Sequence, residues 1–408
     1  MKFDTIIIGG GLSGLVAGID LSRKGQKCLI VSLGQSALHF FSGSFELYGM
    51  GDEPFKTMES LSPQHPYSMI GLENVKVLAD KVKPFFREVG IELKGADGLN
   101  HWRITPLGAI KPAWLTLDEY ASIPADGQMP WKKVAILNID GFLDFHTSYI
   151  AASLEAKGVE TVVKGISMPE LEKLRQNPTE MRSTNISKTL TGDRINTLAA
   201  RINEYAKGVD AVLMPAVVGL TSCSDVVRLK EMVNRPLYFI ATLPPSVPGI
   251  RLQMMLKRHF QKVGGTYMLG DSVTGGEFEN GKLNYITTQN HADVKFEADN
   301  FVIATGSFFS KGLVSDINGV REPIFGLDVI SADQRSDWYK KNLFDAQPYM
   351  NFGVVTDNTF HASLNGVAVK NLYAAGSVIG GCNSMKEGSG AGVAILSALH
   401  VASLILNR

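Results

Sequence analysis

The first 34 residues combine the signals of a strand, a glycine-rich turn, a helix and a second strand. Residues 3–8 are apolar and β-branched, and the run Gly9-Gly10-Gly11-Leu12-Ser13-Gly14 follows them directly. Residues 15–24 have the spacing of an amphipathic helix, and residues 26–31 read as another buried strand. A G-x-G-x-x-G run inside such a βαβ unit is typical of dinucleotide-binding folds. The stretch therefore predicts a Rossmann-like α/β domain.

Each position of the glycine run has its own expected task. Gly9 permits the tight turn out of the strand, and Gly14 lets the helix pack close to the sheet. Gly11 has no Cβ, so a phosphate group can approach its backbone. The N–H groups of Leu12 and Ser13 begin the helix, where unpaired donors and the positive dipole end favour an anion. Together these residues are the predicted phosphate site.

The end of the second strand departs from the usual fingerprint. An Asp or Glu normally stands there and holds the ribose 2′-OH of an adenosine. This chain has Ser32 instead, followed by Leu33 and Gly34. The glycine run favours a dinucleotide such as FAD, whereas the missing acid leaves the adenosine end without its usual partner.

Later stretches repeat the pattern of a strand followed by small residues. Residues 300–306 and 371–377 are apolar runs that end in glycine turns, and the glycine-rich residues 388–392 begin a helix that reaches residue 406. A helix N-terminus of this kind suits the pyrimidine edge of a flavin, where reduction builds negative charge. The predicted cofactor contacts, besides the glycine run and Ser32, are Ser42, Gly43, Ser44, Ala304, Thr305, Gly306, Gly376, Ser377, Gly390, Ala391 and Gly392.

The cofactor segments are far apart in the sequence. A middle section alternates strand-like and helical stretches but has no glycine run, and an Asn280-Gly281 hairpin signal precedes residues 300–306. Residues 72–89 read as one helix, and residues 293–298 and 300–306 read as separate strands. The predicted fold class is α/β, a Rossmann-like split flavin-binding domain with a large inserted α/β domain. The expected boundaries are 1–45, 246–312 and 364–408 for the flavin-binding domain, 46–245 for the inserted domain and 313–363 for a cap or interface segment.

Composition and charge exclude several classes of protein. The chain of 408 residues has 40 Lys and Arg against 40 Asp and Glu, so its charge does not favour nucleic acid. Its 3 cysteines form no C-x-x-C, which argues against a disulfide scaffold, a thiol redox centre and an iron–sulfur cluster held by this chain alone. No metal site, signal peptide or membrane span is expected. The unpaired cysteines agree with a reducing compartment, and the expected location is the cytoplasm.

Seven stretches resemble the family of flavoprotein B subunits of anaerobic glycerol-3-phosphate dehydrogenases. They run from end to end of the chain, and they are not general flavoprotein motifs. They are GQSALHF at 34–40, HPYS at 65–68, TLPPS at 242–246, GIRLQ at 249–253, NHAD at 290–293, GSFFS at 306–310 and REPI at 321–324.

The resemblance implies a flavin-bearing subunit, usually with FMN, in a larger enzyme. The resemblance also implies that this subunit, together with an FAD-bearing A subunit, oxidises sn-glycerol 3-phosphate to dihydroxyacetone phosphate. Electrons would then pass through a membrane-associated iron–sulfur C subunit to quinone, with the complex at the inner face of the cell membrane. FMN has no adenosine and agrees with Ser32, whereas the glycine run favours FAD, so both flavins stay open.

Oxidation of an alcohol phosphate needs a base for the hydroxyl proton and a cation for the phosphate. The candidates are His39, His65, His291, Arg251 and Arg321. The structural alternatives are a packed histidine and a salt-bridged arginine. Two other functions stay open. One is a stand-alone flavin oxidoreductase of another small substrate, such as an amine or a hydroxy acid. The other is a non-catalytic scaffold subunit that has the flavoprotein fold but carries out no redox reaction.

Overall fold

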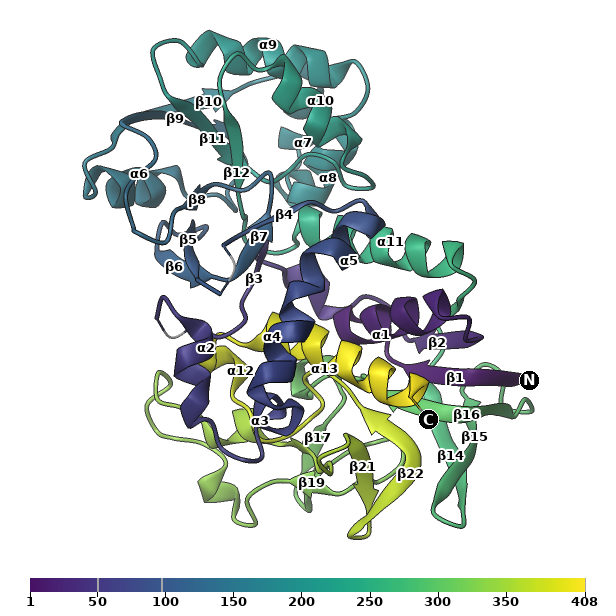
Figure 1. Ribbon diagram of the computed structural model, residues 1–408. Helices are drawn as coiled ribbons and strands as arrows, with labels where there is room; N and C mark the ends of the chain where they lie inside the picture. The colour runs from purple at the N-terminus through teal and green to yellow at the C-terminus, as the bar shows by residue number, and fades with distance from the viewer. Residues whose placement is uncertain (50, 97, 408) are drawn as a thin grey trace.

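The computed structural model describes residues 1–49, 51–96 and 98–407, which form two lobes (Figure 1). The lower lobe contains an eight-stranded sheet with the order β13-β2-β1-β16-β15-β14, in which β22 also pairs with β16 and β21 pairs with β22. Its strands are β1 (Lys2–Ile8), β2 (Cys28–Ser32), β13 (Thr266–Leu269), β14 (Val273–Glu279), β15 (Lys282–Thr288), β16 (Phe296–Ile303), β21 (His361–Leu364) and β22 (Val367–Ala374). Three distant parts of the chain therefore supply one sheet.

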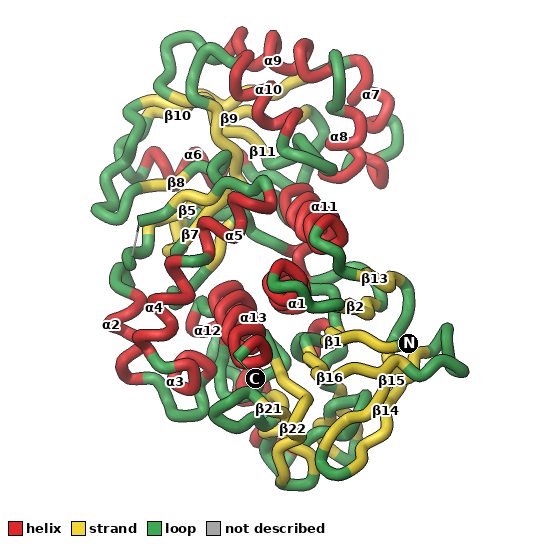
Figure 2. The backbone as a smooth tube through the Cα atoms, turned by 45° about the vertical axis from the view of Figure 1, so that its right-hand side comes forward, coloured by secondary structure: helices red, strands yellow, loops and turns green. Residues whose placement is uncertain are grey.

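The five strands β13, β2, β1, β16 and β22 run parallel to one another. The apolar residues of β2, β1, β16 and β22 are largely buried, as expected for parallel strands covered on both faces, whereas the edge strand β13 is partly exposed. Three helices lie side by side over this part of the sheet (Figures 1 and 2): α1 (Leu12–Arg23), α11 (Val247–Lys262) and α13 (Gly390–Leu406). The carboxyl ends of the parallel strands thus meet the N-termini of α1 and α13.

The upper lobe is a second α/β unit with its own parallel sheet, ordered β10-β9-β11-β12. Its elements are β9 (Lys133–Ile139), α6 (Thr147–Glu155), β10 (Glu160–Ile166), α7 (Pro169–Arg175), η3 (Pro178–Glu180), α8 (Ser183–Thr189), α9 (Arg194–Tyr205), β11 (Ala211–Pro215), α10 (Ser224–Met232) and β12 (Leu237–Ile240). The predicted fold class, a split Rossmann-like unit with a large α/β insertion, is confirmed.

Short elements join the lobes. Two small antiparallel sheets, β3-β7-β4 and β6-β5-β8, precede the upper lobe, and the helices α3 and α4 pack on α13. These elements are β3 (Ser44–Phe45), α2 (Pro54–Thr57), η2 (Met58–Ser60), α3 (Pro66–Ile70), α4 (Leu72–Asp80), α5 (Val82–Val89), β4 (Leu93–Lys94), β5 (His101–Ile104), β6 (Ile110–Ala113), β7 (Leu115–Leu117) and β8 (Ser122–Ile123).

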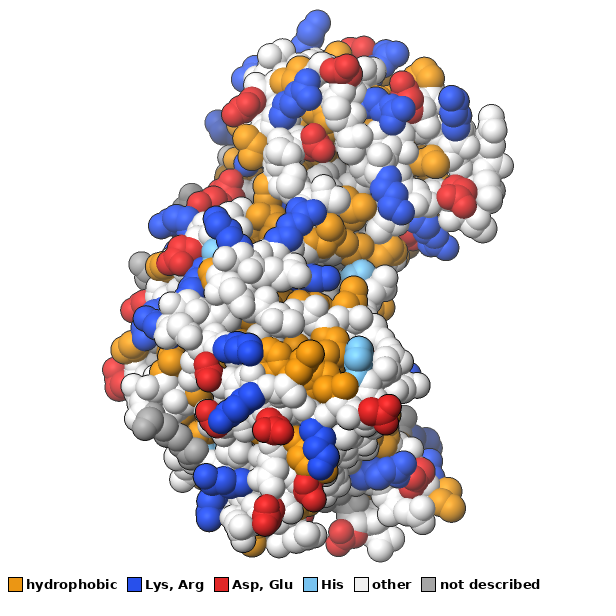
Figure 3. Space-filling model, turned by 90° about the vertical axis from the view of Figure 1, so that its right-hand side faces the viewer, with side chains coloured by type: hydrophobic (Ala, Val, Ile, Leu, Met, Phe, Trp, Pro, Cys, Tyr) orange, Lys and Arg blue, Asp and Glu red, His pale blue; other side chains and the backbone are white. Residues whose placement is uncertain are grey.

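The rest of the chain consists of short hairpins and single turns. They are η1 (Ala37–Phe40), η4 (Phe308–Ser310), β17 (Val314–Asp316), β18 (Gly319–Arg321), β19 (Val329–Ile330), η5 (Arg335–Asp337), η6 (Pro348–Asn351), β20 (Gly353–Val354) and α12 (Ser384–Glu387). On the face shown in Figure 3, hydrophobic side chains gather where the two lobes meet, and both signs of charge are interspersed over the remaining surface.

Two sequence expectations about local structure were wrong. Residues 72–89 read as one helix, but they form α4 and α5 with a break at Lys81. Pro84 is the third residue of α5, a first-turn position where its missing N–H has no intrahelical partner to lose. The runs 293–298 and 300–306 read as separate strands, but β16 is one strand that pairs with β15 in its first half and with β22 in its second.

Candidate functional site

The carboxyl ends of β1, β16 and β22 meet at the first turn of α1. Gly9 has a φ of +119°, and a Cβ there would collide with the backbone carbonyl of Ala304. A Cβ on Gly14 would collide with the carbonyl of Gly9, and a Cβ on Gly376 with the hydroxyl of Ser13. The structure therefore brings together the glycine run, the end of β16 and the end of β22, as the sequence predicted.

Gly11 differs from its neighbours because no protein atom crowds it. The nearest atom to a Cβ built there is the Cβ of Ser36, at 3.9 Å. Gly11 is the N-cap of α1 in extended conformation, and no side chain caps the helix. The first-turn N–H groups of Leu12 and Ser13 follow this uncrowded residue at the positive end of the helix dipole. This geometry fits a flavin phosphate.

Thr305 gives a second sign that this edge accepts a ligand. Its side-chain oxygen is buried, and within the described ranges it has no hydrogen-bond partner. Gly306 follows with a φ of +82°, and a Cβ on it would lie 3.6 Å from the Ser377 hydroxyl. A buried polar atom without a partner is costly unless a ligand or water completes it. Thr305 therefore fits a polar group of the cofactor.

The end of β2 carries neutral polar groups in place of the usual acid. Ser32 Oγ donates to the Gly34 carbonyl at 3.3 Å. Tyr267 Oη and Gln253 Nε2 each lie 3.4 Å from the Gly10 carbonyl, and a Cβ on Gly10 would collide with Tyr267 and Ser32. Hydroxyl and amide groups, rather than a carboxylate, are thus what this strand end offers to a ribose.

His291 lies near the same strand end and is held by an acid. Its Nδ1 is 2.8 Å from Asp271 Oδ2, while Asp271 Oδ1 accepts the N–H groups of Ser272 and Asn290 at 2.8 and 3.0 Å. Burial raises the pKa of Asp271, but the hydrogen bonds it accepts outweigh burial and lower that pKa to about 2. The residue before Asp271 donates its N–H to the Ser32 carbonyl at 2.8 Å. His291 is therefore paired with Asp271, the residue that follows the backbone contact to Ser32.

His39 lies in η1, on the chain that follows β2. Burial lowers its pKa, and a hydrogen bond with Gln253 only partly opposes this, so the neutral ring is favoured. Its backbone carbonyl accepts the Ser246 N–H at 2.8 Å, which fixes η1 against the start of α11. A neutral imidazole in this position is able to accept a proton.

Arg251 is buried and fully engaged, contrary to the expectation that it binds a substrate phosphate. Its side chain is 3% exposed. It donates to the carbonyls of Val218 and Gly219 at 3.1 and 2.8 Å, and it forms an ion pair with Glu119. The arginine thus ties α11 to the loop after β11 and to the segment after β7. Its role is structural, as in the salt-bridge alternative.

Arg321 also has a local partner. It stands at the end of β18 and pairs with Asp316 of β17, across the same hairpin. More than half of its side chain is exposed. The structure does not bring it to the glycine run, so the expected phosphate contact of Arg321 stays a prediction without support from this geometry.

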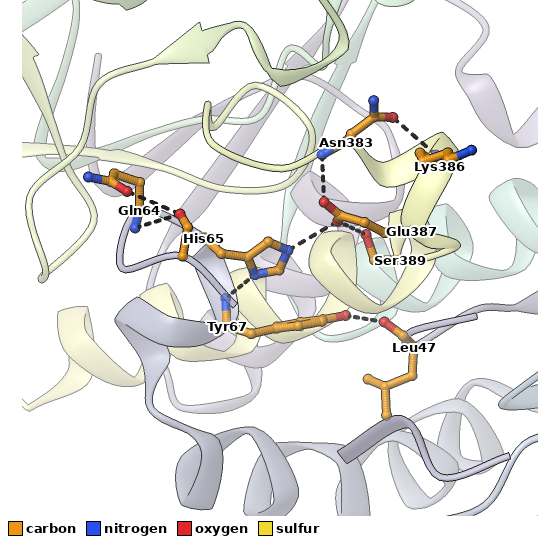
Figure 4. Close-up of polar contacts among 9 residues, drawn as sticks. Leu47, Gln64, His65, Tyr67, Asn383, Lys386, Glu387 and Ser389 are labelled. Atoms are coloured by element: carbon orange, nitrogen blue, oxygen red, sulfur yellow. Dashed lines mark hydrogen bonds and ion pairs between the residues drawn. The ribbon is translucent and has the colours of Figure 1, made fainter. Parts of the chain in front are cut away.

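The residues before α13 form a buried polar cluster with α3 (Figure 4). His65 Nδ1 accepts the Tyr67 N–H at 3.1 Å, and its Nε2 is 3.2 Å from Glu387 Oε2. Glu387 also accepts the Asn383 N–H at 3.0 Å and the Ser389 hydroxyl at 3.1 Å. Burial raises the pKa of Glu387, but these hydrogen bonds, chiefly that from His65, bring it below its usual value. Since Nδ1 accepts, Nε2 carries the proton, and His65 positions the turn rather than acting as a base.

The N-terminus of α13 is closely packed at Gly392 and open at Gly390. The Gly392 N–H donates to the Glu46 carbonyl at 2.9 Å, and a Cβ on Gly392 would collide with the Tyr67 hydroxyl. A Cβ on Gly390 would meet only Ser384, at 3.7 Å. Ser389 is the N-cap, and its side chain does not cap the helix. The expected small-residue terminus is therefore present and accepts a side chain at its first position.

Gly390→Asp is expected to lower the flavin reduction potential by about 10–40 mV. A negative charge at the first residue of α13 opposes the negative charge of the reduced flavin, and a helix-end charge is worth about 0.3–2 kcal/mol, with about 30 mV per 1.4 kcal/mol for two electrons. A redox titration by flavin absorbance measures the shift. Gly390→Asn is the neutral control of equal size. Equal potentials for both variants, with full flavin, would mean that the helix end does not face the flavin.

Sequence reasoning missed Glu46 and Arg103. The hydroxyl oxygens of Ser42 and Ser44, two of the predicted cofactor contacts, are 3.0 Å apart. Ser44 Oγ donates to Glu46 Oε1 at 2.5 Å, and Arg103 donates to the same oxygen at 3.2 Å. Arg103 comes from β5 of the other small sheet, and nothing in the local sequence signals this contact. The spacing of Ser44 and Glu46, two residues apart on an extended strand, was the available clue.

The sheet order and the open glycine edge define a flavoprotein with a dinucleotide-binding fold. Residues 4–393 match the family described as "FAD binding domain". A curated relative from Yersinia enterocolitica serotype O:8 / biotype 1B (strain NCTC 13174 / 8081), named as the B subunit of anaerobic glycerol-3-phosphate dehydrogenase, is 41% identical over 418 residues, which is 100% of this chain and 99% of the relative. One of the same name from Haemophilus influenzae (strain 86-028NP) is 36% identical over 432 residues, 100% of each. The chain belongs to the family of B subunits of anaerobic glycerol-3-phosphate dehydrogenases, and its cofactor is a flavin.

Among solved structures, the chain is similar to L-proline dehydrogenase from P. horikoshii, with 11% sequence identity and a TM-score of 0.38. The match covers 100% of this chain and 94% of the dehydrogenase chain. In the described part of the chain, no helix is long and apolar enough to cross a membrane. Within the same ranges, no group of three or more His, Cys, Asp or Glu is arranged to hold a metal ion.

Proposed function

We propose that this chain is the flavin-bearing B subunit of a complex that oxidises sn-glycerol 3-phosphate to dihydroxyacetone phosphate and passes the electrons towards quinone. The observation that carries the proposal is the full-length identity to the named B subunits, which extends over 99% of the Yersinia relative. The uncapped start of α1 beside the open Gly11 supports the flavin part of it. The flavin, when bound, supplies the acceptor for a hydride.

Residues of this chain are proposed to hold the flavin in two places. The N–H groups at the start of α1 bind phosphate, and the start of α13 faces the pyrimidine edge, where its dipole favours the reduced state. The segments 1–45, 246–312 and 364–408 are proposed as the flavin-binding domain, because they supply seven of the eight strands of the large sheet. The eighth strand, β21 (His361–Leu364), lies almost wholly in segment 313–363. Segment 46–245 is proposed as the insertion and 313–363 as the cap.

The relatives are named as one subunit of a dehydrogenase, so the family works in a multi-subunit enzyme. The proposed partners are an FAD-bearing A subunit and an iron–sulfur C subunit, with attachment to the inner face of the cell membrane through that complex. Of the five candidates, His65, His291, Arg251 and Arg321 are each paired with an acid. His39 has a lowered pKa and, among the described residues, no acidic partner. His39 is therefore the proposed contact to substrate among them.

The test is to purify the complex through a tag on this chain and to add sn-glycerol 3-phosphate without oxygen. Bleaching of the flavin absorbance, and co-purification of a second flavoprotein, are expected. Extraction of the flavin followed by mass determination separates FMN from FAD. A lone chain bleached by another small substrate would favour a stand-alone oxidoreductase. A complex whose tagged chain takes up neither FMN nor FAD would favour the scaffold alternative.

A further inference from the structure

A line of hydroxyl groups leads from Ser42 to a carboxylate. The hydroxyl oxygens of Ser42 and Ser44 are 3.0 Å apart, and Ser44 Oγ donates to Glu46 Oε1 at 2.5 Å. Because a serine has a single hydroxyl proton and Ser44 gives it to Glu46, Ser42 is the donor to Ser44. All hydrogen bonds of the line therefore point towards Glu46.

The middle of the line is buried, and both of its ends are partly exposed. Ser44 is 1% exposed, Ser42 is half-buried, and the Glu46 side chain is 23% exposed. Arg103 donates to Glu46 Oε1 at 3.2 Å and is itself largely buried, so it holds the carboxylate in place at the end of the line. A proton that reaches Glu46 along this line thus has a route to bulk water.

The line is held next to the proposed flavin site by backbone contacts. The Glu46 carbonyl accepts the Gly392 N–H from the first turn of α13, and Ser44 lies in β3, in register with Thr116 of β7. Gly43, between the two serines, has a φ of +83°, and the Tyr120 ring packs where its Cβ would be. Both serine hydroxyls are therefore fixed in place rather than on a loose loop.

Two buried donors beside the line lack partners. Among the described residues, Arg103 Nε and Tyr120 Oη have no hydrogen-bond partner, and Tyr120 is 2% exposed. Buried donors are rarely left unpaired unless a ligand or water completes them. A water molecule or a polar ligand group is therefore needed to complete the hydrogen bonding of Arg103 Nε and Tyr120 Oη.

We propose that Ser42, Ser44 and Glu46 are the proton exit route for the alcohol oxidation, an inference that rests on the proposed function. The substrate C–H bond breaks and its hydride goes to the flavin, while the hydroxyl proton passes to Ser42 as the Ser42 proton moves to Ser44 and the Ser44 proton to Glu46. The electron pair of the O–H bond forms the C=O bond. Glu46, now a carboxylic acid, releases the proton to water.

The test measures flavin reduction by sn-glycerol 3-phosphate in the purified complex, by stopped-flow absorbance. Glu46→Gln keeps the size and the contact to Ser44, and it is expected to slow reduction by about 10²-fold or more. Ser44→Ala is expected to slow reduction with unchanged flavin content. Ser187→Ala, a buried serine of α8 in the upper lobe, is the control and should leave the rate unchanged.

Two further measurements separate a proton route from a structural role. Added formate should restore part of the rate in Glu46→Ala, since a small acid can occupy the vacated space. The infrared difference spectrum between reduced and oxidised complex should show a carboxyl C=O band that is absent in Glu46→Gln. A wild-type rate that persists in both Glu46 and Ser44 variants, or an effect confined to His39→Gln, would overturn the inference. A wild-type complex that sn-glycerol 3-phosphate does not reduce would instead overturn the proposed function.

Discussion

Gly11→Val is expected to abolish flavin binding while the protein still folds. The valine side chain would occupy the space that the phosphate needs beside the start of α1, but its Cβ would lie 3.9 Å from the nearest protein atom. The backbone of Gly11 is extended, with φ −81° and ψ −169°, which a valine adopts without strain. Flavin absorbance per protein should fall by at least 10-fold, and far-UV circular dichroism should match that of the wild type without flavin.

Gly14→Val is the matched control three residues away. Its Cβ would collide with the Gly9 carbonyl, so the helix must move off the sheet and the fold itself is expected to suffer. The two variants therefore separate a ligand effect from a packing effect. Full flavin occupancy in Gly11→Val would remove the phosphate site from this position. Unfolding of Gly11→Val in the absence of flavin would show that the glycine is required by the protein instead.

Arg251→Met is expected to lower the free energy of unfolding by about 3–5 kcal/mol, the usual cost of removing one partner of a buried ion pair. The variant leaves the Glu119 carboxylate with its side chain 11% exposed and without its cation. It also leaves the Val218 and Gly219 carbonyls without their donor. Urea unfolding followed by intrinsic fluorescence measures the change.

Arg321→Met is the control for Arg251→Met, because Arg321 has the same kind of partner on an exposed hairpin. Exposed ion pairs contribute little, so its unfolding midpoint should stay close to that of the wild type. The double variant Arg251→Met with Glu119→Leu should recover part of the loss, since it removes the unpaired buried charge. An unchanged stability of Arg251→Met would contradict the structural role assigned to this residue.

The parts of the fold that were predicted well are those fixed by local sequence. The glycine run and the strands around it follow from short-range patterning, and α13 runs from Gly390 to Leu406, as its apolar small residues indicated. The break of residues 72–89 at Lys81 was missed, because the helical periodicity continues across it and the packing of α4 on α13 decides where the helix ends. Tertiary contacts override periodicity at such points.

The candidate site was predicted less completely, since its contacts join residues that are distant in sequence. Arg251 was a reasonable phosphate ligand until the structure placed it against Glu119, 132 residues earlier in the chain. Glu46 and Arg103 meet across 57 residues and two separate small sheets. Residue type alone does not show whether an arginine is available to a ligand or is already paired with a carboxylate of the protein. The pairing depends on which elements pack together.

The large insertion between β2 and α11 has a consequence for the order in which the protein is made. β1 and β2 leave the ribosome early, but β2 gains its second neighbour, β13, only when residues 266–269 have been synthesised. β1 likewise pairs with β16 only after residues 296–303 have been synthesised, and β16 pairs with β22 only after residues 367–374 have been synthesised. The four strands of the upper lobe, in contrast, all lie between residues 133 and 240 and can pair before then. The nascent chain thus acquires its upper lobe first, and it becomes able to take up flavin only near the end of translation.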